Sequence, residues 1–167
     1  AVYDARTTLG LDPESIRLVE ENYKDFVRSG ALLSAAEKER LVAINTDIAE
    51  LNTSFDQNVL AEVNASAVVV DSREELSGLT DAEIQTAANA ATARNMPGKY
   101  VLPLLNTSGQ PLLTSLDNRA LRQRIMETSL ARGSRGGEYD NREILSRTAL
   151  LRAEKAQMLG YPNHAAY

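Results

Sequence analysis

The chain has 167 residues, 43% of them hydrophobic and 25% charged, a composition typical of a globular protein with one domain and a substantial core. Its 18 basic and 23 acidic residues give a formal net charge of −5, which argues against nucleic acid as the main partner. No apolar run approaches the roughly 18 residues of a membrane span, no signal peptide is recognisable, and there is no cysteine. We therefore expect neither nucleic acid nor a membrane as partner. The expected location is cytoplasmic, or periplasmic if a longer parent carries a signal peptide.

The N-terminal part of the chain is expected to be irregular over 1–11 and then helical. Asp12-Pro13 places an N-cap aspartate before a proline at the first helical position, which predicts a helix over 13–29. Gly30 ends this helix as a C-cap. Because only a short connection leads to the next helix, the two are expected to form a long antiparallel helical hairpin.

That next helix, predicted over 34–63, is the longest in the chain. Ser34 and Glu37 form a capping box at its start. At 1.5 Å per residue it measures roughly 45 Å, whereas a compact protein of this length is about 40 Å across. The protein is therefore elongated, or this helix is one wall of something larger.

Apolar residues recur along this helix at spacings of three and four, which is typical of a coiled-coil seam. The seam consists of Leu41, Ile44, Ile48, Leu51 and Phe55. Leu51 and Phe55 are expected inside the core, where the substitution Phe55→Ala costs about 3–5 kcal/mol of stability.

A small sheet is predicted from three segments. The run at 67–71 is rich in β-branched residues, as strands are. Segments 99–105 and 111–116 flank Asn106-Thr107-Ser108-Gly109, a turn signal that predicts a β-hairpin. Together they predict a three-stranded antiparallel sheet.

Three further helices are predicted, over 80–95, 117–132 and 140–159. The first begins with a capping box formed by Thr80 and Glu83. The other two begin with the same phrase, Asp-Asn-Arg, in which Asp117 and Asp140 are expected to be the N-caps. The predicted fold class is mainly α, with a long helical hairpin, further helices and the small sheet.

The stretch Arg132–Gly137, RGSRGG, is the one segment that looks like a ligand loop. Its glycine N–H groups and two arginines could hold a phosphate or a carboxylate. It lacks the Gly-Lys-Ser/Thr ending of a P-loop and does not follow a strand. The alternative interpretation is a flexible connection between two helices.

No catalytic, cofactor-binding or metal-ligating residue can be assigned from the sequence. The single histidine, His164, lacks the partners of a catalytic triad, and with no cysteine no recognisable zinc site can be built. The remaining candidates are acidic groups expected on solvated faces and tyrosines too scattered for a stacking platform: Glu20-Glu21, Glu37 with Glu39, Glu74-Glu75, Tyr23, Tyr100, Tyr139 and Tyr161.

Four phrases carry a resemblance to a known family. They are FVRSGALL at 26–33, NVLAE at 58–62, PLLTSLDNR at 111–119 and LGYPNHAAY at 159–167. In this order and spacing the chain, from about Asp12 onward, resembles the thimet-oligopeptidase-like zinc metallopeptidases. The resemblance is closer to the bacterial peptidyl-dipeptidase (dipeptidyl carboxypeptidase) branch than to oligopeptidase A.

The resemblance implies a large helical protein whose channel admits short peptides and whose zinc is held by a His-Glu-x-x-His helix and a later glutamate. This chain contains no such motif, so no catalytic or metal-binding residue is carried over to it. The chain also lacks an initiator methionine and ends one helical turn after Asn163. We therefore expect a scaffold segment from before the catalytic motif, with the remainder of the parent chain and short peptide substrates as partners.

Two other functions compete with this expectation. The seam at Leu41–Phe55 could make the chain a free-standing helical protein-interaction module without enzymatic activity. The loop at Arg132–Gly137 could make it a small anion-binding protein. A His-Glu-x-x-His motif downstream in a longer reading frame would favour the peptidase.

Overall fold

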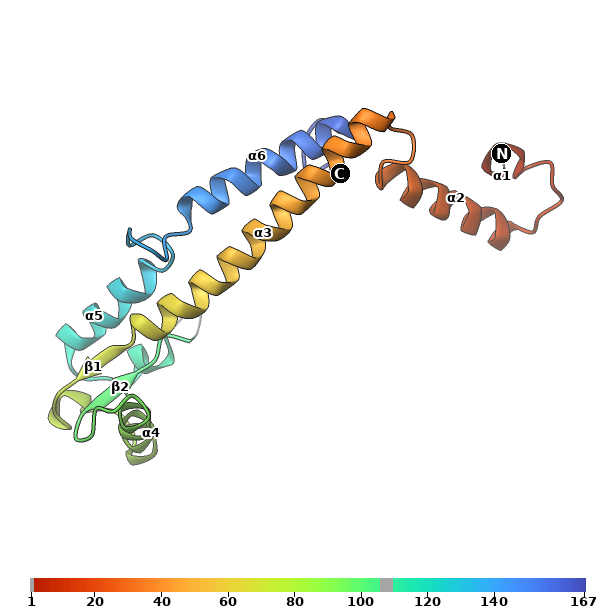
Figure 1. The fold of residues 1–167 in the computed structure, drawn as a ribbon. Helices are drawn as coiled ribbons and strands as arrows, with labels where there is room; N and C mark the ends of the chain where they lie inside the picture. The colour runs from red at the N-terminus through yellow and green to blue at the C-terminus, as the bar shows by residue number, and fades with distance from the viewer. Residues whose placement is uncertain (1, 106–109) are drawn as a thin grey trace. The chain divides into compact units, whose positions relative to one another are not determined.

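The computed structural model describes residues 2–105 and 110–167 (Figure 1). The chain divides into two compact units. Unit 1 comprises Ala1–Asn52 and Leu145–Tyr167, and unit 2 comprises Thr53–Ile144. The described residues are mainly helical, which confirms the predicted class, and they include one two-stranded antiparallel sheet. None of the helices in these residues combines the length and apolar character needed to cross a lipid bilayer.

The helices and strands have the following bounds. The α-helices are α1 (Val2–Ala5), α2 (Pro13–Arg28), α3 (Ala35–Ala65), α4 (Asp81–Thr92), α5 (Arg119–Leu130) and α6 (Arg142–Met158). The strands are β1 (Val68–Val70) and β2 (Tyr100–Leu102), and two short 3₁₀ helices are η1 (Glu74–Leu76) and η2 (Pro111–Thr114). Because α3 is continuous over 31 residues, the prediction of one unbroken long helix is confirmed.

Side-chain caps explain why several helices begin where they do. In the capping boxes of α3 and α4, the N–H groups of Ser34 and Thr80 each donate to a glutamate three positions later, at 2.8 Å in both cases. The hydroxyl groups of Ser34 and Thr80 accept from the N–H of the same glutamates. Asp12 caps α2 through the N–H groups of Glu14 and Ser15. These three predicted caps are confirmed.

The other two predicted caps need correction, because α5 and α6 begin later than 117 and 140. Asn118 caps α5 by accepting from the N–H of Leu121 at 3.1 Å, while Asp117 accepts from the hydroxyl of Ser77 at 2.8 Å. Asp140 lies one residue before the N-cap position of α6, although its carboxylate still accepts from the N–H of Arg142 at 3.0 Å.

In unit 1, α1 packs on α2, and the part of α3 in this unit lies beside α6. Tyr3 stacks on Tyr23 with ring centroids 3.6 Å apart, so the expectation that residues 1–11 are irregular is wrong for α1. Arg40 of α3 donates to both oxygens of Glu154 of α6, at 2.7 and 2.8 Å. Within the described part of unit 1, side chains of α3 pair with α6, and α2 does not run back along α3 as the predicted hairpin requires (Figure 1).

In unit 2, β1 pairs with β2, with Val68 opposite Leu102 and Val70 opposite Tyr100. The prediction of a third strand at 111–116 is wrong, because Pro111–Thr114 forms η2. Proline cannot donate to a strand ladder but fits the first position of a helical turn. The predicted turn at 106–109 lies outside the described residues.

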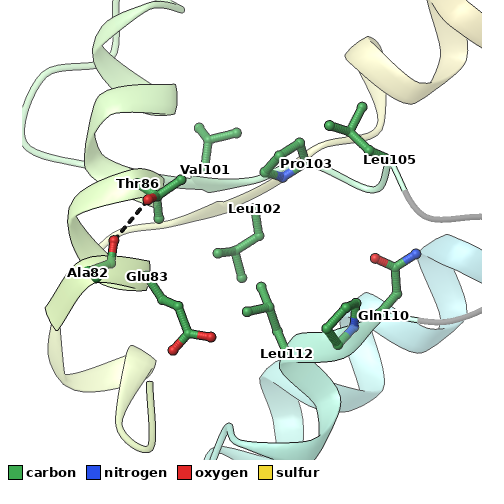
Figure 2. A pocket seen from close by; sticks show the side chains of 11 residues that line it. Ala82, Glu83, Thr86, Val101, Leu102, Pro103, Leu105, Gln110 and Leu112 are labelled. Atoms are coloured by element: carbon green, nitrogen blue, oxygen red, sulfur yellow. Dashed lines mark hydrogen bonds between the residues drawn. The ribbon is translucent and has the colours of Figure 1, made fainter. Parts of the chain in front are cut away.

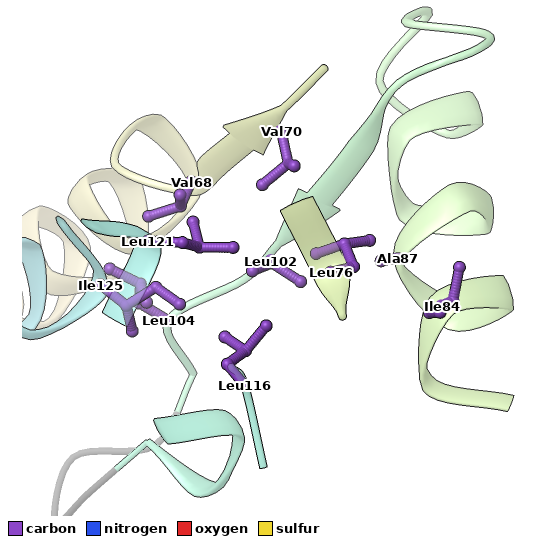
Figure 3. Packing of buried hydrophobic residues seen from close by; sticks show 10 residues of the cluster. All are labelled: Val68, Val70, Leu76, Ile84, Ala87, Leu102, Leu104, Leu116, Leu121 and Ile125. Atoms are coloured by element: carbon purple, nitrogen blue, oxygen red, sulfur yellow. The ribbon is translucent and has the colours of Figure 1, made fainter. Parts of the chain in front are cut away.

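The hydrophobic core of unit 2 is formed by the sheet with η1, α4 and α5 (Figure 3). Its fully buried members come from different elements: Val70 from β1, Leu76 from η1 and Ile125 from α5. The alanine-rich face of α4 packs on β2, where Ala87 is 3% exposed. The small alanine side chains allow this close approach between the helix and the strand.

The apolar seam of α3 is buried only near its start. Leu41 and Ile44 are buried, whereas Ile48, Leu51 and Phe55 are half-buried. The expectation that Leu51 and Phe55 are core residues is therefore wrong. Around Phe55 the helix makes polar contacts instead, and the carbonyl oxygen of Phe55 accepts a hydrogen bond from Asn141.

The substitution Phe55→Ala is accordingly expected to cost less stability than Ile125→Ala in the same unit. Ile125 is 1% exposed, and loss of so buried a side chain costs about 2–5 kcal/mol. Urea unfolding of the two variants measures the difference. A larger loss for Phe55→Ala would mean that this part of the seam is covered in solution.

Gly78 holds the turn between η1 and α4 against the chain that follows η2. Its φ is +94°, and an added Cβ would lie 2.0 Å from the carbonyl oxygen of Ser115. Gly98 has a φ of +84° but no atom within 4 Å of an added Cβ, so it is a matched control. We expect Gly98→Ala to cost only the strain of a left-handed residue, about 1–2 kcal/mol. Gly78→Ala is expected to cost clearly more, and equal urea midpoints for the two variants would contradict the close approach.

Candidate functional site

The loop at Arg132–Gly137, which connects α5 to α6 in unit 2, binds a carboxylate of the same chain. One carboxylate oxygen of Glu62, Oε2, accepts from the N–H of Gly133 at 2.5 Å. The other, Oε1, accepts from Nε of Arg135 at 2.7 Å. We call Glu62, Gly133 and Arg135 the carboxylate clamp. It uses the donors that the sequence predicts for an external anion.

Burial makes this contact significant. Glu62 lies near the C-terminal end of α3 and is only 4% exposed, so its charge has almost no access to water. A buried charge is tolerated only when it is paired and hydrogen-bonded. Arg135 provides the opposite charge, and its guanidinium also donates to the carbonyl oxygen of Thr128 in the last turn of α5. The clamp therefore joins α3, α5 and the loop.

Asn141 forms a second buried link beside the clamp. It is 1% exposed; its side-chain amide donates to the carbonyl oxygen of Phe55 at 3.3 Å and accepts from Asn58 at 3.0 Å. Its backbone N–H donates to the carbonyl oxygen of Gly133 at 2.8 Å. Gly133 within the loop and Asn141 just before α6 are thus both attached to the stretch of α3 from Phe55 to Glu62.

The other anion-binding groups of the loop also have internal partners. The N–H of Gly136 donates to Asp140 at 2.7 Å, and the guanidinium of Arg132 donates to the carbonyl oxygen of Leu104. The hypothesis that this loop binds a free phosphate therefore loses its main donors. The segment does connect α5 to α6, as the alternative interpretation predicts, and hydrogen bonds hold it at several points.

Sequence reasoning missed Asn58, Glu62 and Asn141. A signal for two of them was present, since the seam spacing continued beyond Phe55 by three and then four residues reaches Asn58 and Glu62. Polar residues at seam positions point to a buried polar contact rather than to a solvated face. Asn141 had no comparable signal, because Asp-Asn-Arg reads as an ordinary helix start.

Asp140 stabilises the far end of the loop. The guanidinium of Arg142 is the main cause that holds the pKa of the Asp140 carboxyl below its usual range, followed by the N–H of Arg142. The N–H of Gly136 acts in the same direction. The carboxylate stays ionised and keeps these contacts at neutral pH.

Unit 2 also holds an open pocket of about 410 Å³ between α4, β2 and η2 (Figure 2). Its walls are mainly apolar, and Val101 and Leu102 line it from the strand. Glu83 in its wall is engaged in the capping box of α4, and the hydroxyl of Thr86 donates to the carbonyl oxygen of Ala82 at 2.8 Å. This arrangement suits an apolar side chain, and both polar groups named here, from among the described lining residues, are engaged in contacts within α4.

The remaining sequence candidates do not form a site. His164 is exposed, and its ring centroid lies 6.1 Å from that of Tyr167. Glu20 pairs with Arg6 at 3.0 Å, and Glu21 pairs with Arg17 at 2.6 Å. Across residues 2–105 and 110–167, no three His, Cys, Asp or Glu side chains gather in a group able to hold a metal ion.

Comparison with known proteins confirms the family resemblance. The chain is 39% identical over 167 residues to the dipeptidyl carboxypeptidase of Escherichia coli (strain K12), covering 100% of the chain and 24% of that protein. The dipeptidyl carboxypeptidase of Salmonella typhimurium is also 39% identical, with 25% of its length covered. Oligopeptidase A of Escherichia coli is 31% identical over 153 residues, covering 89% of the chain and 22% of that protein.

The chain thus spans about a quarter of the length of these curated relatives. The match to the dipeptidyl carboxypeptidases extends over the whole chain and exceeds that to oligopeptidase A in identity, as the four sequence phrases predict. No family model matches the chain.

Asp140 leads to a prediction for pH dependence. Because its pKa is lowered by folding, its contribution to stability is present above the unfolded pKa of about 3.9 and is lost as the pH falls toward the folded pKa. Asp140→Asn is therefore expected to be less stable than the unaltered chain at pH 7, with a difference that shrinks below about pH 4. Thermal unfolding across this range measures it. Asp56→Asn, at an exposed position of α3, is the control for the loss of one negative charge, and a constant difference for Asp140→Asn would contradict the role of its carboxylate.

Proposed function

We propose that this chain, a homologue over its full length of bacterial dipeptidyl carboxypeptidases, is a non-catalytic scaffold segment of a thimet-oligopeptidase-like zinc metallopeptidase. The parent protein hydrolyses short peptides and removes dipeptides from their C-termini. The observation that carries the proposal is the 39% identity to the Escherichia coli dipeptidyl carboxypeptidase over all 167 residues. The parent's remaining chain and its peptide substrates are the partners that follow.

The described residues do not fit a zinc site, so no catalytic step is assigned to them. His164 is exposed and the chain has no cysteine, which leaves carboxylates, and these do not gather into a metal-binding group in the described segments. Zinc in proteins is usually held by three or four His, Cys or carboxylate ligands. The proposal therefore places the zinc ligands in other parts of the parent protein.

Exposed apolar side chains support a scaffold role. Leu18 and Phe26 of α2 are 64% and 66% exposed, and Leu150 of α6 is 65% exposed. Exposed apolar side chains become favourable contacts when other protein elements cover them. We propose that the rest of the parent chain covers these side chains of α2 and α6. A free-standing interaction module would expose similar side chains, so the experiment has to separate the two.

The first test uses the 167-residue chain alone. We expect it to hold no stoichiometric zinc and to release no dipeptide from an N-terminally blocked peptide, with or without added zinc. Metal analysis and a peptide assay with a chelator control measure both. Stoichiometric zinc bound to the chain, or release of a dipeptide that a chelator inhibits, would contradict the proposal.

The second test asks whether the chain performs the scaffold role. A chimera replaces the aligned quarter of the Escherichia coli dipeptidyl carboxypeptidase with this chain. We expect the chimera to bind zinc and to release dipeptides, whereas the same relative without that quarter is expected to be inactive. A folded chimera that binds zinc but does not cleave would favour the interaction module instead.

A further inference from the structure

We propose that Gly133 and Arg135 form a preorganised carboxylate receptor, with the Glu62 side chain as its resident ligand. The receptor accepts a free small carboxylate when that side chain is removed. Each oxygen of the Glu62 carboxylate meets one donor, at 2.5 Å from the Gly133 nitrogen and 2.7 Å from Nε of Arg135. One donor per oxygen, with one of the two charged, is the pattern of strong charge-assisted recognition.

The receptor groups are held by contacts that do not involve Glu62. The carbonyl oxygen of Gly133 accepts from the N–H of Asn141 at 2.8 Å, and Gly133 has a φ of +66°, a conformation that favours glycine. The guanidinium of Arg135 is also held by the carbonyl oxygen of Thr128. Loss of the Glu62 carboxylate therefore leaves both donors near their present positions.

The vacated space matches a specific ligand. Glu62→Ala removes a CH₂–COO⁻ group, which has the size and charge of acetate. Because Glu62 is 4% exposed, that group leaves a buried space next to a positive charge and an unpaired N–H. Unpaired buried donors are unfavourable, so a small carboxylate that restores both contacts stabilises the folded state by mass action.

The experiment measures the melting temperature of Glu62→Ala at pH 7 with sodium acetate, with sodium chloride at equal ionic strength, and with acetamide. We expect acetate to recover a large part of the lost melting temperature, and chloride and acetamide to recover little. Sodium chloride controls for the screening of charges by salt. Acetamide controls for a molecule that has the shape of acetate but no charge. The variant Glu138→Ala, at an exposed position of the same connection, is expected to show no specific response to acetate.

A second readout follows the loop itself. Trypsin cuts after arginine, and Arg132 and Arg135 are both held in the present structure. We expect faster cleavage at these two positions in Glu62→Ala and slower cleavage when acetate is added. A folded Glu62→Ala variant whose stability and cleavage ignore acetate would overturn the proposal.

If Glu62→Ala does not fold, the near-isosteric substitution Glu62→Gln and the charge-removing substitution Arg135→Gln provide the test. The two residues are receptor and ligand only if their effects on melting temperature are strongly non-additive in the double variant. Additive effects would overturn the proposal.

Discussion

The Glu62 carboxylate is almost fully buried, since the residue is only 4% exposed, and a buried charge needs hydrogen-bond donors. In unit 2 these donors come from the connection between α5 and α6, which the carboxylate therefore holds in place. Residues 132–138 contain no large apolar side chain, so hydrophobic burial cannot hold this stretch of the connection in place. Glu62 holds it instead, through Gly133 and Arg135. A glycine-rich segment that resembles a binding site for an external anion thus serves as the binding site for an internal one.

Residues at spacings of three and four line one face of α3 along its length, but the kind of contact that they make changes from apolar to polar. Leu41 and Ile44 are buried apolar residues in unit 1, while Asn58 and Glu62, at the continued spacing of three and four, make polar contacts in unit 2. Buried polar pairs add little net stability compared with well-packed apolar residues, but they are selective for their partner. One face of one helix therefore supplies burial in one unit and selective polar contacts in the other.

The sequence predicted the helix caps at Ser34 and Thr80 correctly and the strand pairing only in part. The capping boxes at Ser34 and Thr80 depend only on residues three positions apart, and both are present. The sheet depends on distant residues: segments 67–71 and 99–105 were both predicted to belong to it, and β1 does pair with β2. The third segment, 111–116, was added on the turn signal and is not a strand. Pro111 could have excluded it from the centre of a sheet.

The candidate site could be predicted only in part, for a similar reason. The loop at Arg132–Gly137 was recognisable from its glycines and arginines, but its ligand lies 71 residues away from Gly133 in sequence. A glutamate on a helix is usually solvated. Only the position of Glu62 in the seam distinguishes it from the other acidic residues of α3.

The described carboxylates with identified contacts are used for structure, which bears on the role of the chain. Glu37 and Glu83 complete capping boxes, Asp140 binds the start of α6, and Glu62 is held in the clamp. General acid–base catalysis needs a group within reach of the reacting atoms and free to exchange its proton. Carboxylates engaged as caps and clamps do not meet that need, because proton uptake would break the contacts that order the fold. Such a distribution suits a segment that positions other elements.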